Sequence, residues 1–260
     1  MLSKNQVKYI NSLKIKKFRQ EHGIFIAEGE KCAAELLYSN LEVTSVYALP
    51  GWLDENLGVL ESKNILFTET DEAGRAKISD LTTPNKVVAL ARIPKPEFTA
   101  ELYSHYIVAL DNIKDPGNMG TIIRTADWFG IRQIVCSPGC VDAYNPKVVQ
   151  STMGSITRVS IHYLELAKFI RQKPEGTPVY GALLHGRSLN KTAFDTKGIL
   201  IIGSESHGIS PEILPLVTNA IHIPTFSQNE AITNAESLNA SIANAIICYE
   251  LSKQLFEKKS

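Results

Sequence analysis

The residues that could carry chemistry fall in three segments, each passing from an apolar strand through a polar loop into a helix start. The first segment runs from Leu110 to Gly130. Helical spacing predicts a buried stripe formed by Ile122, Ile123, Ala126 and Phe129. Arg124 lies off this stripe, and Asn118 suits a helix N-cap. A capping Asn with a surface Arg is the ordinary structural interpretation, whereas ligand binding at a strand end of an open α/β sheet is the functional one.

The second segment, residues 199–212, joins a fully apolar strand to a loop and a Ser-Pro-Glu helix start. Gly203 and Gly208 would allow the backbone to approach a ligand closely. The loop fits neither GxGxxG nor GxxxxGK[ST], so it indicates neither a dinucleotide nor a nucleoside triphosphate. Glu205, between the two glycines, could accept hydrogen bonds from a ligand, although a carboxylate near a helix N-terminus also has a structural use.

The third segment, residues 221–245, again leads from a strand through a polar loop into a helix. Ser237 is expected to begin this helix as its cap. Asn239 and Asn244 are poor choices inside an apolar, alanine-rich helix start unless their amides have partners. Because function is expected where local preferences are violated, this misfit points to a site.

Regular elements must bring these segments together. Apolar strands alternate with helical patterns in the C-terminal part, which predicts a parallel sheet covered by helices, an α/β fold. The expected strands are 106–110, 133–136, 179–184, 199–203 and 220–223. The last and longest helix should run from Ser237 to about Glu257.

The chain is expected to contain two domains, since its 260 residues exceed the common size of one domain. Prolines near residue 95 break any regular element and predict a linker over 96–103. We therefore expect a small α/β domain over 1–95 and a larger domain over 104–260. In the first domain, the pattern predicts one imperfect amphipathic helix from Asn5 to Phe18, a second helix at 31–38, and strands at 24–27, 43–49, 65–67 and 87–91.

Basic charge is concentrated at the N-terminus. The formal net charge is zero, which argues against unspecific nucleic-acid binding, yet residues 1–20 carry six Lys or Arg and no carboxylate. Such a run is either a solvated helix face or a phosphate-binding surface.

Composition excludes several classes of protein. No apolar run is long enough to cross a bilayer, and the N-terminus lacks the features of a secretory signal, so a cytoplasmic location is expected. The four cysteines form no CxxC pair and no cluster with zinc spacing. We expect free, packed thiols and no metal site.

The three segments together resemble the SpoU family, also called TrmH-like, of the SPOUT class of RNA methyltransferases. The resemblance rests on the order and spacing of several short motifs. These are Asp115-Pro-Gly-Asn-Met-Gly, Ile123-Arg124-Thr-Ala-Asp127 with Gly130, Gly203-Ser-Glu205 with Gly208, Ile223-Pro224, and Ser237-Leu-Asn239. It covers about residues 104–255, and residues 18–31 are similar to the family's N-terminal substrate-binding domain.

This resemblance implies a parallel α/β domain that ends in a deep trefoil knot, preceded by a small L30e-like RNA-binding domain. It also implies a homodimer and bound S-adenosylmethionine. The positions that would hold the cofactor, largely through backbone contacts, are Ala182, Gly203, Ile223 and Leu238. Knots are too rare for sequence physics alone to propose one.

The implied reaction is methylation of a ribose 2′-hydroxyl in structured RNA, ribosomal RNA of the 23S type being favoured over tRNA. Arg124 would be catalytic, and Asn118, Glu205, Ser237 and Asn239 would arrange it. A ribose hydroxyl is a weak nucleophile and needs alignment together with proton removal or charge stabilisation. Family members suggest that Arg124 acts as the base, but arginine resists deprotonation, so stabilisation of the developing alkoxide is the alternative.

In this context the N-terminal basic run is interpreted as an RNA-binding surface that reads shape and phosphates. Its expected RNA-binding residues are Lys14, Lys16, Lys17 and Arg19.

Two departures from the family pattern are visible. Ser206 stands where the family has glycine, and Gln150 stands where many members have arginine. Both could alter substrate choice, and neither removes a predicted site residue. The alternatives are an inactive RNA-binding relative and base methylation on the same scaffold.

Overall fold

The computed structural model describes residues 2–226 and 236–258. The chain folds into two compact units, which are described separately. The first contains residues 1–95 and 142–158, and the second contains residues 96–141 and 159–260. Residues 142–158, predicted to belong to the C-terminal domain, pack within the first unit. No described helix is long and apolar enough to cross a membrane.

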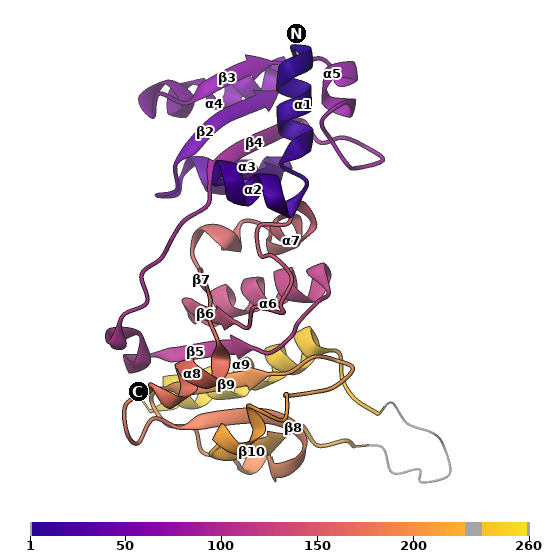
Figure 1. Cartoon of the computed structure of the whole chain (residues 1–260). Helices are drawn as coiled ribbons and strands as arrows, with labels where there is room; N and C mark the ends of the chain where they lie inside the picture. The colour runs from indigo at the N-terminus through magenta and orange to yellow at the C-terminus, as the bar shows by residue number, and fades with distance from the viewer. Residues whose placement is uncertain (1, 227–235, 259–260) are drawn as a thin grey trace. The chain divides into compact units, whose positions relative to one another are not determined.

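The first unit is built on a four-stranded mixed sheet in the order β1-β4-β2-β3 (Figure 1). Its strands are β1 (Ile24–Glu28), β2 (Val43–Ala48), β3 (Leu66–Glu69) and β4 (Val87–Arg92). β4 is antiparallel to β1 and β2, while β2 and β3 are parallel. Its helices are α1 (Lys4–Ser12), α2 (Lys16–His22), α3 (Glu30–Leu37), α4 (Pro50–Ser62), α5 (Glu72–Ala76) and α7 (Pro146–Thr152).

The N-terminal helical segment differs from the prediction of one helix over residues 5–18. α1 ends at Ser12, and Ile15 has an extended backbone before α2 begins. α2 then stops at Gly23, which adopts a left-handed φ of 64° that costs glycine little. The break lets Ile10 and Leu13 enter the core against β1, with Ile24 and Ile26.

The second unit is a six-stranded sheet in the order β10-β8-β9-β5-β6-β7, in which all neighbouring strands are parallel. The strands are β5 (Tyr106–Leu110), β6 (Gln133–Cys136), β7 (Ser160–Tyr163), β8 (Val179–Ser188), β9 (Gly198–Ile202) and β10 (Asn219–His222). Its helices are α6 (Pro116–Trp128), α8 (Leu166–Arg171) and α9 (Ala240–Glu257). The predicted α/β class with a parallel sheet is confirmed. β7 was not predicted.

The central strands β5 and β9 are buried at every residue, as expected for a sheet covered on both faces. α6 packs against α9. Side chains of β5, β9 and α8 form a common core that contains Ile107, Ile199, Ile201, Phe169 and Ile170. This rigid centre fixes where the strands end, and therefore where the polar loops begin.

Short 3₁₀ helices complete the chain. They are η1 (Ala100–Ser104), η2 (Ser155–Thr157), η3 (Leu189–Lys191) and η4 (Leu214–Leu216). η1 overlaps the predicted linker over 96–103. Its Tyr103 is buried in the core of the second unit, and the Tyr103 hydroxyl donates to the Phe169 carbonyl at 2.8 Å.

Candidate active site

The candidate site lies at the carboxyl edge of the sheet in the second unit. Because β5 and β9 are adjacent and parallel, the loops that follow them leave the sheet at the same edge. The first loop leads into α6 and the second carries Glu205, while Asn239 stands at the start of α9, which packs on α6. The fold thus gathers all three segments that the sequence singled out.

The caps of the two helices differ from the predictions. Asp115, not Asn118, caps α6, and its carboxylate accepts the Asn118 backbone N–H at 2.8 Å. Asn239, not Ser237, caps α9, and its Oδ1 accepts the N–H groups of Ser241 and Ile242. Both predictions chose a plausible capping residue a few positions away from the actual one. As a result, the Asn118 side chain is free for other contacts.

Side-chain amides join the three segments directly. The Asn118 Nδ2 group donates to Glu205 Oε1, and Asn118 Oδ1 accepts from Asn239 Nδ2 at 2.9 Å. Asn239 also accepts from the Ser241 hydroxyl at 2.7 Å. Position 118 therefore needs a side chain with both a donor and an acceptor, and a carboxylate of the same shape has only acceptors. The misfit of Asn239 in the sequence is explained by its two uses, as a cap and as a donor to Asn118.

The Glu205 loop is shaped by its own glycines. Ser204 and Gly208 exchange backbone hydrogen bonds of 3.0 and 2.8 Å. A Cβ atom on Gly203 would lie 2.1 Å from the Gly208 carbonyl carbon, so no side chain fits there. Gly208 has a φ of 66°, in the left-handed region. These glycines are required by the tight turn itself, in addition to the close approach of a ligand that the sequence predicts.

Asp111 and Asn112 connect the loops around the site and were missed by sequence reasoning. Asp111 is 2% exposed, and its carboxylate accepts the Ser210 N–H at 2.7 Å and the Asn112 amide at 2.9 Å. The Asn112 N–H donates to Ser137 Oγ at 3.0 Å. One buried carboxylate therefore holds the ends of β5 and the Glu205 loop together. The available signal was an Asp-Asn pair directly after a fully apolar strand.

A pocket of about 550 Å³ opens beside this network. It is lined by Asn112, Lys114, Ser204, Glu205, Ser206, His207, Gly208, Ser210 and Pro211. Hydroxyl, amide, carboxylate and ammonium groups are all present in this lining. Ser206, one of the departures from the family pattern, is among them and is placed to affect what enters.

Two buried thiols lie at the end of β6 and in the loop that follows it. Cys136 and Cys140 are both buried, and Cys140 Sγ donates to the Leu110 carbonyl at 3.2 Å. A hydrogen bond from the Cys136 thiol lowers the pKa of Cys140 to about 7, while the same contact and burial raise the pKa of Cys136. All four cysteines are free, and no group of three or more metal-binding side chains occurs among residues 2–226 and 236–258.

Arg124 and Ser237 stand apart from the amide network. Arg124 is exposed on α6, with no ion pair or hydrogen bond from its side chain within the described part of the chain. Ser237 is also exposed and without a hydrogen bond among the described residues. The structure thus brings together Asn118, Glu205 and Asn239, and leaves Arg124 and Ser237 accessible at the surface of the same unit.

Three of the four positions expected to hold a cofactor lie in or directly after neighbouring strands. Ala182 is in β8, Gly203 directly follows β9, and Ile223 directly follows β10. These three are partly buried, and Leu238, which precedes α9, is 47% exposed. Gly203 therefore lies at the same carboxyl edge as the amide network, and Leu238 directly precedes Asn239 of that network.

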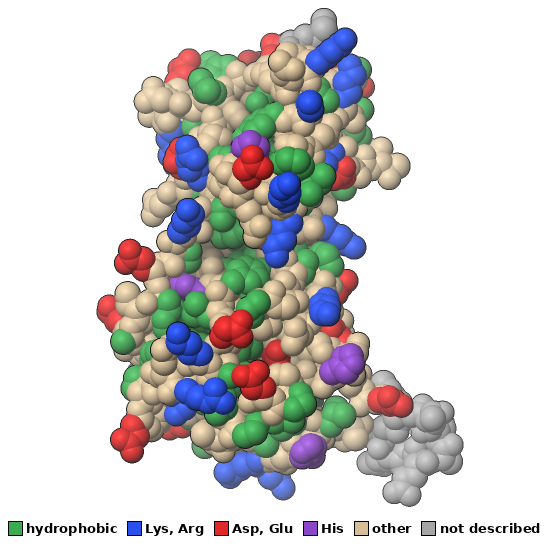
Figure 2. All heavy atoms as spheres, viewed as in Figure 1, with side chains coloured by type: hydrophobic (Ala, Val, Ile, Leu, Met, Phe, Trp, Pro, Cys, Tyr) green, Lys and Arg blue, Asp and Glu red, His purple; other side chains and the backbone are tan. Residues whose placement is uncertain are grey.

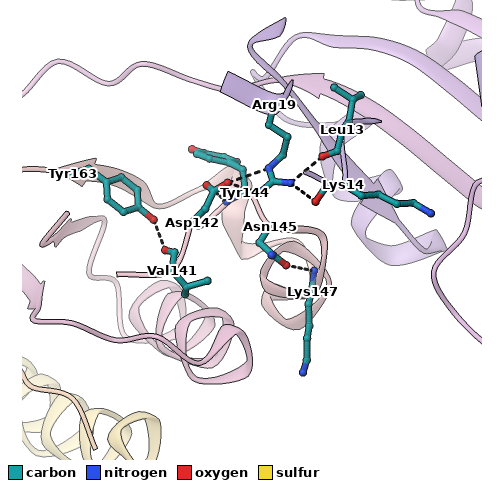
Figure 3. A network of polar contacts seen from close by, with 9 residues as sticks. All are labelled: Leu13, Lys14, Arg19, Val141, Asp142, Tyr144, Asn145, Lys147 and Tyr163. Carbon is teal, nitrogen blue, oxygen red and sulfur yellow. Dashed lines mark hydrogen bonds and ion pairs between the residues drawn. The ribbon is translucent and has the colours of Figure 1, made fainter. Parts of the chain in front are cut away.

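The predicted RNA-binding residues fall into two groups. Lys16 and Lys17 are exposed, whereas Lys14 forms an ion pair of 2.6 Å with Asp80. Arg19 is only 1% exposed. Figure 3 shows its guanidinium pointing to Asp142 and to two backbone carbonyls. The expected RNA contact of Arg19 is therefore replaced by an internal role, because its charge is already paired within the first unit.

Two family models match separate parts of the chain. Residues 105–249 match the SpoU rRNA Methylase family, and residues 4–89 match the MRM3-like substrate binding domain. The first match covers more than half of the chain. The chain belongs to the SpoU rRNA methylase family and is an RNA methyltransferase.

Individual relatives match this chain over nearly its full length. The chain is 30% identical to the 23S rRNA (guanosine(2553)-2′-O)-methyltransferase RlmP of Bacillus subtilis (strain 168), over 96% of this chain and 97% of the relative. A putative RNA methyltransferase of the TrmH family from Porphyromonas gingivalis is 37% identical, with a TM-score of 0.85 and coverage of 98% and 99%. An AdoMet-bound rRNA methyltransferase from Sinorhizobium meliloti is 27% identical, with the same TM-score and coverage of 98% and 97%.

Proposed function

We propose that this protein transfers the methyl group of S-adenosylmethionine to a ribose 2′-hydroxyl in ribosomal RNA. The observation that carries the proposal is the hydrogen-bonded set Glu205, Asn118 and Asn239, which unites the three family motifs at one edge of the sheet. The relative from Bacillus subtilis supports ribosomal RNA over tRNA, since its name gives a 23S rRNA ribose as its target.

The residues present fit S-adenosylmethionine. Ala182 and Gly203 are small, which leaves room beside the strand ends, and Ile223 and Leu238 supply partly exposed apolar side chains for a flat adenine ring. The AdoMet-bound relative from Sinorhizobium meliloti supports this assignment. When bound, the cofactor supplies an electrophilic methyl group on a sulfonium.

Arg124 is proposed as the catalytic residue. It has no carboxylate partner within the described residues, so its charge is available to a substrate phosphate or to the developing alkoxide of the ribose. Stabilisation of that alkoxide suits a guanidinium that resists deprotonation. The amides of Asn118 and Asn239 hold the loop of Glu205 against both helix starts, and this fixed geometry orients the reacting groups. Ser237 lies two residues before Asn239 and is proposed to contact the substrate.

The test of this function is the Arg124→Ala variant. We expect methyl transfer from labelled S-adenosylmethionine to ribosomal RNA from a strain lacking this protein to fall by at least about a hundredfold. The affinity for S-adenosylmethionine, measured by isothermal titration, should stay within about twofold. Retained turnover would contradict the role of Arg124. Absence of cofactor binding by the wild-type protein, with and without RNA, would favour an RNA-binding relative that is not an enzyme, and a methyl group found on a base would favour the base-modifying alternative.

We further propose that the second unit contains the family's trefoil knot, and that residues 1–95 form an L30e-like RNA-binding domain, which a linker over 96–103 joins to the methyltransferase domain. The match of residues 4–89 to a substrate binding domain supports the second point. A cytoplasmic location is proposed because the function requires access to ribosomal RNA.

A homodimer is proposed from the apolar surface of α6 and α9. Large apolar side chains at helical spacing on α9 are exposed, and Trp128 of α6 is 84% exposed. The exposed apolar side chains that form this face are Leu238, Ile242, Ile246 and Tyr249. Contiguous apolar side chains on a surface are typical of an interface between chains.

A further inference from the structure

We propose that the first unit binds an unpaired nucleotide of the RNA in a hollow between α1 and α2, by stacking the base on aromatic side chains. The inference rests on the proposed action on RNA and extends it to a specific contact. The hollow measures about 370 Å³ and is lined by Asn5, Lys8, Tyr9, Ser12, Phe18 and His22. The four RNA-binding residues expected from the sequence, Lys14, Lys16, Lys17 and Arg19, are not among them.

The lining follows from helix periodicity. On α1, Asn5, Lys8, Tyr9 and Ser12 are spaced by three, four and seven residues from the first, so they share one face. On α2, Phe18 and His22 are four residues apart and also share a face. The break between the helices at Ile15 turns these two faces toward one hollow.

The aromatic groups offer the geometry that a base requires. The rings of Tyr9 and His22 are 5.2 Å apart at an interplanar angle of 74°, so the two rings form a corner. Tyr9 is 36% exposed, His22 is exposed and Phe18 is half-buried. A base inserted in this corner can stack on one ring and meet the edge of another. Stacking of this kind contributes about a tenfold gain in affinity or more for one base and tolerates any base.

The charge around the hollow suits a phosphate backbone. Lys8 lines it, and Lys4, Lys16 and Lys17 are exposed on the same two helices, with no ion pair to any of the four in the part of the chain that the structure describes. Figure 2 shows Lys and Arg side chains on the surface over α1 and α2. Aromatic rings that stack bases, set among lysines that pair with phosphates, are typical of surfaces that bind single-stranded RNA.

Stacking and phosphate binding can be separated with two labelled probes. One is an oligoadenylate of about ten nucleotides, and the other is a ribose-phosphate oligomer of the same length without bases. Fluorescence anisotropy with the full-length protein should show about tenfold tighter binding of the oligoadenylate. His22→Ala and Tyr9→Leu should each remove most of that difference and leave the affinity for the abasic oligomer unchanged. Lys8→Ala should weaken both.

Matched variants control for folding. Tyr9→Phe keeps the ring and should retain the preference for bases, and Tyr38→Leu removes a tyrosine that is 75% exposed elsewhere in the first unit and should change nothing. Equal affinity of the wild-type protein for both oligomers would overturn the proposal, as would an undiminished preference in folded His22→Ala and Tyr9→Leu variants. Cofactor binding and methyl transfer are measured separately, so failure of the hollow to bind a base is distinguishable from failure of the proposed enzyme function.

Discussion

At the scale of single residues, the site depends on which atoms donate and which accept. Asn118 donates to Glu205 and accepts from Asn239 with the two ends of one amide. Asparagine is suited to this position because its oxygen and nitrogen have opposite hydrogen-bonding roles on one planar group. The identity of residue 118 therefore decides whether the three motifs stay connected.

Replacing Asn118 by Asp should break the hydrogen bonds that connect the three motifs. The new carboxylate cannot donate to Glu205 and would repel it, and loss of a hydrogen bond to a charged group costs about 1.5–3 kcal/mol. We expect methyl transfer to fall roughly 10- to 100-fold. Asn190→Asp is the matched control in the same unit, because among the described residues Asn190 hydrogen-bonds through its oxygen alone, which accepts from Ser188 Oγ at 2.7 Å. Equal turnover by both variants and the wild-type protein would contradict the proposed role of the amide.

At the scale of elements, β7 contains a buried titratable group at the edge of the sheet. His162 is 6% exposed, hydrogen-bonds Gln133 at 2.9 Å and meets the Phe98 ring at 5.3 Å. Burial lowers the pKa of His162 below its ordinary value of 6.5, since a charged ring would lose its hydration. The folded state therefore favours the neutral ring, and protonation of His162 at low pH destabilises the fold.

The direction of this pKa shift predicts how the free energy of unfolding depends on pH. Above the unfolded pKa near 6.5 both states are neutral at His162 and no penalty arises. As pH falls from there toward the folded pKa, only the unfolded chain takes up the proton, and stability is lost by at most about 1.4 kcal/mol per pH unit. Thermal unfolding between pH 7.5 and 5 should show a shallower loss for His162→Gln than for the wild-type protein. His105→Gln, at an exposed position, should behave like wild type, and parallel curves for all three would refute the assignment.

The elements also show what the sequence could and could not predict. Apolar runs located β5, β6 and β9 closely, because buried parallel strands need continuous apolar side chains. β7 was missed because Ser-Ile-His-Tyr has no such run. The caps were misplaced because Asp115 and Asn118, or Ser237 and Asn239, are equally good capping residues, and tertiary contacts decide between them. The burial of Arg19 depends on Asp142, which is 123 residues away, so no local pattern could indicate it.

At the scale of the whole molecule, the exposed face of α9 predicts self-association. Ile242 and Tyr249 are 49% and 58% exposed, and the Tyr249 ring lies 6.3 Å from Phe129 near the contact of α9 with α6. Substituting Ile242 by Glu places a charge in the centre of this face and should weaken a dimer roughly thirtyfold or more, the effect of about 2 kcal/mol. Light scattering over a dilution series measures it. Tyr38→Glu, on the other unit, should leave the mass unchanged, and a monomeric wild-type protein would contradict the proposed dimer.

The first unit is completed by a segment distant in the sequence, and a buried ion pair connects them. Arg19 Nη2 lies 2.5 Å from Asp142 Oδ2, and Arg19 Nη1 donates to the carbonyls of Leu13 and Lys14 at 2.9 Å (Figure 3). α7, which follows Asp142, packs against β1. Arg19→Met fills a similar volume but removes the guanidinium from two carbonyls and from the Asp142 carboxylate, which keeps the Tyr144 N–H as a donor.

Removing one partner of a buried ion pair lowers the free energy of unfolding by about 3–5 kcal/mol, because the remaining charge is left without its partner in a poorly hydrated place. Urea unfolding of Arg19→Met should show a loss of this size. Arg92→Met provides the comparison, since Arg92 forms an ion pair of 3.0 Å with Glu42 in which both side chains are more than half exposed. An exposed pair contributes about 1 kcal/mol or less, so this variant should unfold almost like the wild-type protein. Similar losses in both variants would show that Arg19 acts as a surface charge, and would return it to the RNA-binding role that the sequence suggested.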